Sequence, residues 1–361
     1  MHAALPYNKG KSIKIELLLH FGKIYDTLWL SAGSTAFGKE LLMAENKTSC
    51  SFRTSIGGQA LIEGVMMRGP EKQAIAVRNK DGEIILKVEE LKFIKDRYPI
   101  LGVPVIRGAV NFIGALISGV KALMYSADFF PEEEAEPSKF EKWLEEKLGS
   151  AKLEKAVVYL SVVLSVLMTV GLFILLPTFL AGLVDPYINS AAVHNLIEGV
   201  VRIAVFMAYL ILCSNQKDIK RVFAYHGAEH KTIFCYESGL PLTPENAAQM
   251  KKHHPRCGTS FLFVVLVVNI LVSSVVFSYV EWRNMWVRMG LHLLMLPLIV
   301  GITYEFNRYV GRHDNPVTRV LSKPGMWLQN FTTNEPDASM LEVAIAAMEA
   351  VIPDRQGKDQ W

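Results

Sequence analysis

Four long apolar runs lie between residues 156 and 305 of this 361-residue chain and predict membrane-spanning helices. The first run, residues 156–184, is uncharged and exceeds the roughly 20 apolar residues that a helix needs to cross a bilayer. The other three runs cover residues 196–213, 261–280 and 290–305. The pattern therefore predicts a mainly α-helical, multi-pass membrane protein with about four transmembrane helices.

A fifth apolar segment, residues 99–130, is interrupted by Arg107 and Lys121. The uncharged run between these two residues is too short to span a membrane, and its glycines permit close helix packing. We predict a re-entrant or interfacial helix in this segment. The alternative is a soluble amphipathic helix that covers the β unit preceding it.

Strand-like alternation of apolar and polar residues precedes this helix. It extends over residues 74–78 and 83–88, and the Asp81-Gly82 step between them is typical of a hairpin turn. We predict a small antiparallel β unit of two or three strands within residues 55–98. Because so small a unit is not stable alone, it must pack on another part of the chain.

The remaining segments are more polar. Residues 131–155 predict a charged linker with a solvated helix, and residues 214–259 form a histidine-rich segment between the second and third spans. The tail, residues 306–361, ends in a predicted amphipathic helix, with Asp337 or Ser339 as its N-cap. We expect the tail helix to dock on a polar domain that it forms together with the β unit and the histidine-rich segment.

Residues 1–54 form an extension without the anatomy of a signal peptide. Gly38, Lys39 and Glu40 can be encoded by a purine-rich sequence that binds ribosomes, shortly ahead of Met43. We therefore expect translation to start at Met43. The alternative is a genuine disordered or amphipathic extension.

The charge distribution predicts the orientation in the membrane. The net charge of +3 is small and spread over linkers, which argues against a nucleic-acid partner. Lysine and arginine are frequent before the first span, in residues 214–259 and after the fourth span, whereas residues 185–195 contain none. The positive-inside rule then places both termini and the histidine-rich segment in the cytoplasm, with the lipid bilayer of the cell membrane as partner.

The four cysteines show no short paired spacing, so a disulfide framework is not expected. They are Cys50, Cys213, Cys235 and Cys257. Cys235 and Cys257 lie near the histidines and are candidate thiolate ligands, although each could also be a small buried hydrophobic residue.

The strongest chemical motif is H-x-x-E-H, formed by His226, Glu229 and His230. On a helix, histidines four residues apart share one face, so both can bind one metal ion, for which zinc is the best candidate. The glutamate between them is a candidate catalytic general base for a metal-bound water. Candidates for a third ligand are His254, Cys257 and Glu305, and Glu305 could instead pair with a nearby arginine.

Five motifs carry a resemblance to a known family. They are IGGQALIEGVMMRGP at 56–70, YHGAEHKTIFCYE at 225–237, HPRCGTSFL at 254–262, YEFNR at 304–308 and WLQNFTTNEPD at 327–337. They resemble the YqhQ-like family of bacterial multi-pass membrane proteins, described as metal-dependent enzymes of unknown function. The resemblance implies a multi-pass membrane protein with a metal site at His226, Glu229 and His230, to which His254, Cys257 and Glu305 are candidate additions. It does not extend to residues 1–42.

Two hypotheses for the function follow. The first is a zinc-dependent hydrolase at the cytoplasmic membrane face, with Glu229 as its base. The second is a non-catalytic membrane-protein assembly or scaffolding factor, in which the same histidines form a structural metal site or a hydrogen-bonded site. A transporter is less well supported, because the spans show no evident inverted repeat. The sequence does not identify a substrate.

Overall fold

The computed structural model describes residues 52–91, 98–130, 150–277, 279–280, 284–313, 315–355 and 357–360, and Phe52–Trp361 cluster as one compact unit. The expected start at Met43 and the first part of the predicted charged linker, residues 131–149, lie outside the described residues.

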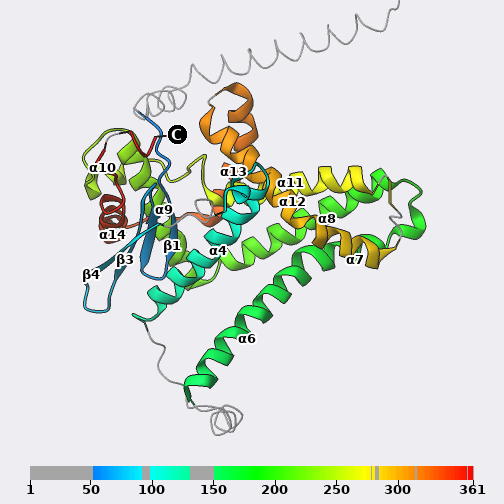
Figure 1. The fold of residues 1–361 in the computed structure, drawn as a ribbon, viewed down its shortest axis with the longest axis horizontal. Helices are drawn as coiled ribbons and strands as arrows, with labels where there is room; N and C mark the ends of the chain where they lie inside the picture. The colour runs from blue at the N-terminus through cyan, green and yellow to red at the C-terminus, as the bar shows by residue number, and fades with distance from the viewer. Residues whose placement is uncertain are drawn as a thin grey trace, which may run out of the picture. The chain divides into compact units, whose positions relative to one another are not determined.

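Most of the described chain is helical (Figure 1). The helices are η1 (Pro99–Gly102), α4 (Ile106–Ala127), α6 (Ser150–Val170), η2 (Gly171–Leu175), α7 (Leu176–Gly182), η3 (Asp185–Tyr187), α8 (Ala191–Ser214), α9 (Lys217–Glu237), α10 (Pro244–Ala248), α11 (Gly258–Val276), α12 (Met285–Arg312), α13 (Pro316–Thr332) and α14 (Ala338–Glu349). The π-helical turn η2 joins α6 and α7 into one continuous rod. The predicted fold class, a mainly α protein with a small β unit, is confirmed.

Four strands form one antiparallel sheet in the order β1-β2-β3-β4. They are β1 (Gly57–Leu61), β2 (Gly64–Arg68), β3 (Lys72–Arg78) and β4 (Ile84–Glu90). Gly82 in the turn between β3 and β4 has φ +87, a conformation that glycine adopts without strain. The sheet has more strands than the predicted two or three, because the glycine-rich β1 and β2 lack clear alternation and yet pair with each other.

Both faces of the sheet are covered, because successive side chains of a strand point to opposite faces. On one face, Ala74 and Ala76 of β3 pack in a core shared with α9 and α14. On the other face, Ile75 and Val77 pack against Ala122 of α4. The small sheet is thereby stabilised by helices that lie far apart in the chain, as its size required.

Five helices of the described chain are long and apolar enough to cross a membrane. They are Ile106–Ala127, Leu160–Gly182, Ala191–Ser214, Gly258–Val276 and Met285–Arg312. The last four correspond to the four predicted spans. The first is α4, which continues through the charged residue Lys121 and which the sequence predicts to be re-entrant or interfacial.

Helix α4 contacts two different parts of the molecule. Near its start, Gly108 lies against α12, where an added Cβ would be 2.7 Å from Cβ of Tyr304. Near its end, Ala122 packs in the core of the sheet, and Ser126 Oγ accepts a hydrogen bond from the backbone N–H of Ile62 at 3.3 Å. The helix therefore connects the apolar bundle to the sheet.

The C-terminal helix α14 docks on the sheet, as predicted. The Asp337 carboxylate caps it by accepting a hydrogen bond from the Met340 backbone N–H at 2.9 Å. Leu341, Ala344 and Met348 follow at helical spacing and are buried in the core with β2, β3 and α9. The histidine-rich helix α9 thus lies beside α14 on the same face of the sheet and packs on both.

Candidate metal centre

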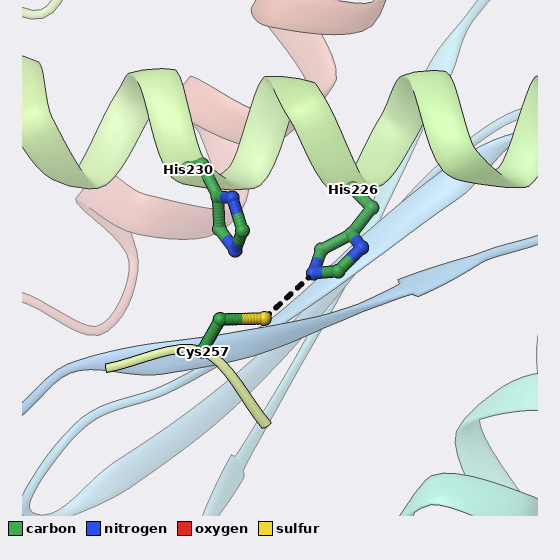
Figure 2. A group of neighbouring side chains, drawn as sticks. All are labelled: His226, His230 and Cys257. Carbon is green, nitrogen blue, oxygen red and sulfur yellow. Dashed lines mark hydrogen bonds between the residues drawn. The ribbon is translucent and has the colours of Figure 1, made fainter. Parts of the chain in front are cut away.

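The two histidines of the H-x-x-E-H motif lie one turn apart on α9 and point in the same direction (Figure 2). The ring centroids of His226 and His230 are 4.4 Å apart. Gly227, between them in sequence, lies against the backbone of Asn334, so a larger side chain would push that segment away from α9. Gly227 therefore allows the segment at Asn334 to pack closely against α9.

A backbone carbonyl orients each imidazole. His226 Nδ1 donates a hydrogen bond to Thr332 O at 2.8 Å, and His230 Nδ1 donates one to Lys252 O at 2.5 Å. Because a carbonyl only accepts, Nδ1 carries a proton in both rings, and in the neutral form of each ring the lone pair is then on Nε2. Metal-binding histidines are commonly held in this way, with the remaining ring N–H anchored on an acceptor.

Cys257 approaches the two Nε2 atoms from the start of α11. Its Sγ lies 3.2 Å from His226 Nε2, and the three potential ligand atoms lie within 4.8 Å of one another (Figure 2). Burial raises the pKa of the Cys257 thiol, but His230 and the hydrogen bonds from Thr259 together lower it by more than burial raises it. The pKa is therefore below its ordinary value. The thiol is therefore closer to the thiolate form that binds metals.

Burial keeps His230 uncharged. It lowers the pKa of this imidazole to about 4, so the ring is neutral at pH 7. Its Nε2 is buried and makes no hydrogen bond within the described part of the chain. A buried acceptor without a donor is unusual in folded proteins, and a cation at this position would satisfy it.

Glu229 lies on the side of α9 that faces β1. Its side chain is buried, and an added Cβ on Gly58 would be 3.0 Å from its Cδ. Burial raises the pKa of Glu229 to about 7, while the nearby His226 and the Gly58 backbone N–H favour the charged form. The carboxyl group is therefore able to exchange a proton near neutral pH.

Two other candidate ligands lie outside the three-residue cluster. His254 is close to it, but its Nε2 faces the Glu237 carboxylate at 3.8 Å. Glu305 accepts hydrogen bonds from Arg107 of α4 at 2.7 and 2.5 Å. Glu305 is therefore an ion-pair partner of α4, whereas the sequence suggested an arginine close to it in the chain. Cys235 is buried in the core with the sheet, as a small hydrophobic residue.

The sequence did not point to Glu237, which organises the cysteine-bearing loop. This buried carboxylate accepts from Arg256 and from the Thr54 backbone N–H, the latter at 2.8 Å. Gln329 of α13 also holds the loop, because its side chain donates to His254 O and accepts from His254 N. In the sequence, only Arg256 beside Cys257 indicated these contacts, because Glu237 and Gln329 lie far from the loop along the chain.

A second polar cluster lies among the apolar helices, away from the histidine motif. Glu198 of α8 accepts hydrogen bonds from Arg202, Arg288 and Thr178 and lies 2.7 Å from His292 Nε2. All of these side chains are buried. Buried charges inside an apolar bundle are costly unless paired, so this network joins α7, α8 and α12.

Comparison with known proteins gives two matches. Residues 103–354 match the family described as "Protein of unknown function (DUF1385)". The sequence is also 34% identical over 305 residues to "Uncharacterized protein YqhQ" of Bacillus subtilis (strain 168), covering 82% of this chain and 92% of that protein. No solved structure matches the chain.

Proposed function

Because this chain belongs to the YqhQ-like family of unknown function, DUF1385, as its motifs suggested, we propose a function from its own site. The protein is a metal-dependent hydrolase that works at the cytoplasmic membrane face. His226, His230 and Cys257 hold a divalent ion, for which zinc is the best candidate, and Glu229 acts as the general base. The five long apolar helices support a location in the membrane, and the site residues support the chemistry.

The convergence of three ligand atoms carries the proposal. Two imidazole Nε2 atoms and one sulfur lie within 4.8 Å of one another, with both Nδ1 atoms anchored on carbonyls. This donor set is one that zinc accepts. Because structural zinc sites have four protein ligands and catalytic ones three, a set of three fits a catalytic centre better.

Glu229 supplies the second part of the proposal. A catalytic zinc provides an activated water, and a neighbouring carboxylate holds and returns its proton. Glu229 is buried beside His226 and Cys257 and its pKa of about 7 suits both steps. Hydrolysis is therefore the reaction class that this set of residues supports best.

The alternative is the non-catalytic factor, and one observation favours it. The three ligands and their two carbonyl anchors belong to α9, α13 and the loop that ends at the N-cap of α11, so a metal here would tie three segments together. In that case the ion stabilises the domain on which partner membrane proteins assemble. The two functions share the metal and differ in the role of Glu229.

Metal analysis of purified protein tests the proposal. We expect about one zinc per chain in the wild type, loss of metal in His226→Ala/His230→Ala, and retention in the control His313→Ala, an exposed histidine at the end of α12. Glu229→Gln should keep the metal and lose function in cells. Absence of metal from the wild type would contradict the metal-dependent hydrolase. A Glu229→Gln protein that retains function would support the non-catalytic factor with a structural metal instead.

A further inference from the structure

A cavity of about 1340 Å³ lies beside the candidate metal centre. Its walls come from the sheet, from α4, from the start of α11, from the end of α12 and from the middle of α13. Cys257 is part of the wall, so the cavity reaches one of the proposed metal ligands. Because α11 begins and α12 ends here, the cavity lies where apolar spans meet the polar domain.

The lining of the cavity is strongly basic. Seven lining residues are Lys or Arg, and two are Glu. Three of the basic residues have carboxylate partners, namely Lys87 with Glu89, Arg107 with Glu305 and Arg256 with Glu237. The other four form no ion pair with any described residue, and they are Arg68, Lys121, Arg308 and Arg312. The cavity therefore has an excess of positive charge even when the remaining Glu90 is counted.

Arg68 is the most informative of these four residues. It ends β2, is partly buried, and lies near the Tyr304 hydroxyl group of α12. Burial lowers its pKa from the ordinary value, yet an arginine stays protonated in proteins. A partly buried guanidinium without a carboxylate is costly, and an anion in the cavity would pair with it.

Part of the cavity wall is apolar. Phe112 of α4 and Phe261 of α11 stack with ring centroids 5.8 Å apart and both line it. Next to them on α4, Ile113, Leu116 and Ile117 are more than half exposed. A continuous apolar surface thus leads from the cavity along a helix that is apolar enough to lie in a membrane.

A cationic cavity with an apolar exit at the ends of membrane spans fits an amphiphile with an anionic head. We propose that the cavity binds the anionic headgroup of a membrane lipid, with its acyl chains against α4 and α11. The lipid class is then the substrate class of the metal centre, an inference that rests on the proposed function. A soluble anion would use the basic residues but not the apolar wall.

Lipid binding can be measured without knowledge of the reaction. The probe is dioleoylphosphatidylglycerol added to detergent-purified full-length protein, with dioleoylphosphatidylcholine as the neutral lipid and native mass spectrometry as the readout. Each basic residue near an anionic lipid surface contributes about a fivefold gain in affinity. We expect Arg68→Gln/Arg312→Gln to lose about 25-fold in affinity for the anionic lipid and little for the neutral one.

The matched control is Lys217→Gln/Lys220→Gln, which removes two exposed charges at the start of α9, outside the cavity. We expect this variant and His226→Ala/His230→Ala to bind the anionic lipid as the wild type does. Equal binding of the two lipids, an unaffected Arg68→Gln/Arg312→Gln protein, or equally tight binding of soluble glycerol phosphate would overturn the inference. Lipid selectivity in a wild-type protein that holds no metal when purified would contradict only the proposed function.

Discussion

At the scale of single residues, Glu229 makes the stability of the protein depend on pH. Its pKa is raised from 4.5 to about 7 by burial, so the folded state disfavours the charged carboxylate. The contribution of Glu229 to the free energy of unfolding is fully present below pH 4.5, the ordinary pKa of the carboxyl group. It is lost as the pH rises from there through 7, the pKa in the folded state. In metal-free protein, we expect Glu229→Gln to be more stable than the wild type by about 3 kcal/mol at pH 8 and by little at pH 4.5.

Thermal unfolding in detergent with a chelator, followed from pH 4.5 to pH 8, measures this difference. The control is Glu349→Gln, an exposed carboxylate at the end of α14, which should change stability equally little at both ends of the range. A Glu229→Gln protein that is less stable than the wild type at pH 8 would show that the charged carboxylate has a favourable partner in the folded state.

Gly58 is the residue that lets β1 approach Glu229. An added Cβ would be 2.9 Å from Met67 Sδ and 3.0 Å from Glu229 Cδ, in a core without room for it. We expect Gly58→Ala to lower the free energy of unfolding by about 1–3 kcal/mol. Gly57→Ala is the control, because nothing lies within 4 Å of an added Cβ there. Equal effects of the two substitutions on the unfolding midpoint would contradict this packing.

The sequence predicted part of this site, and the reason for the limit is physical. The spacing of His226 and His230 fixes a shared helix face, so local geometry alone brings them together. Cys257 remained one of three candidates, because its position depends on contacts of its loop with Glu237 and Gln329. The backbone carbonyls that anchor the imidazoles carry no side-chain signal at all.

At the scale of helices, the crossing of α4 and α12 depends on a small residue. An added Cβ on Gly108 would lie 2.7 Å from Tyr304 Cβ and 2.9 Å from Gly301 Cα. We expect Gly108→Ala to destabilise the protein by about 1–3 kcal/mol. Gly114→Ala on the same helix meets nothing within 4 Å and should be neutral or slightly stabilising, because alanine favours helix. Melting curves of the two variants in one detergent compare them directly.

The Glu198 network tests how α7, α8 and α12 are held together. Glu198→Gln removes the carboxylate between Arg202 and Arg288, both buried, and leaves two arginines without their partner. Loss of one member of a buried ion pair costs about 3–5 kcal/mol, so we expect a comparably lower unfolding free energy. Glu349→Gln again serves as the exposed control. A variant that unfolds with the wild type would mean that the network contributes little to stability.

Helical elements were more predictable than their partners. The four apolar runs predicted spans because apolar length alone decides them, and the Asp337 cap follows from local chemistry. Strand β2 was not predicted because both faces of the sheet are covered there, which removes polar positions from a buried strand. Strand β1 was not predicted because its sequence GGQAL is rich in glycine and shows no clear alternation. The pairing of Arg107 with Glu305 was not predicted because these residues are 198 positions apart.

At the scale of the whole molecule, the contacts constrain which helices cross the membrane. The sheet packs directly on α9 and α14, so all three lie on one side of the bilayer. Two crossings, α11 and α12, separate α9 from α14, which agrees with this requirement. Three candidate spans separate the sheet from α9, namely α4, the rod Leu160–Gly182 and α8. An odd number of crossings would place the sheet and α9 on opposite sides, so one of the three does not cross.

We infer that α4 is the helix that does not cross, because its last turns pack in the core of the sheet through Ala122 and Ser126. We therefore predict that a reporter fused after Asp128 or after Gly239 is cytoplasmic, and that one fused after Tyr187, in the loop between α7 and α8, is extracytoplasmic. Alkaline phosphatase and green fluorescent protein fusions read the two sides independently. If α4 crossed the bilayer, the fusions after Asp128 and Tyr187 would exchange sides, and the contact between the sheet and α9 could not form.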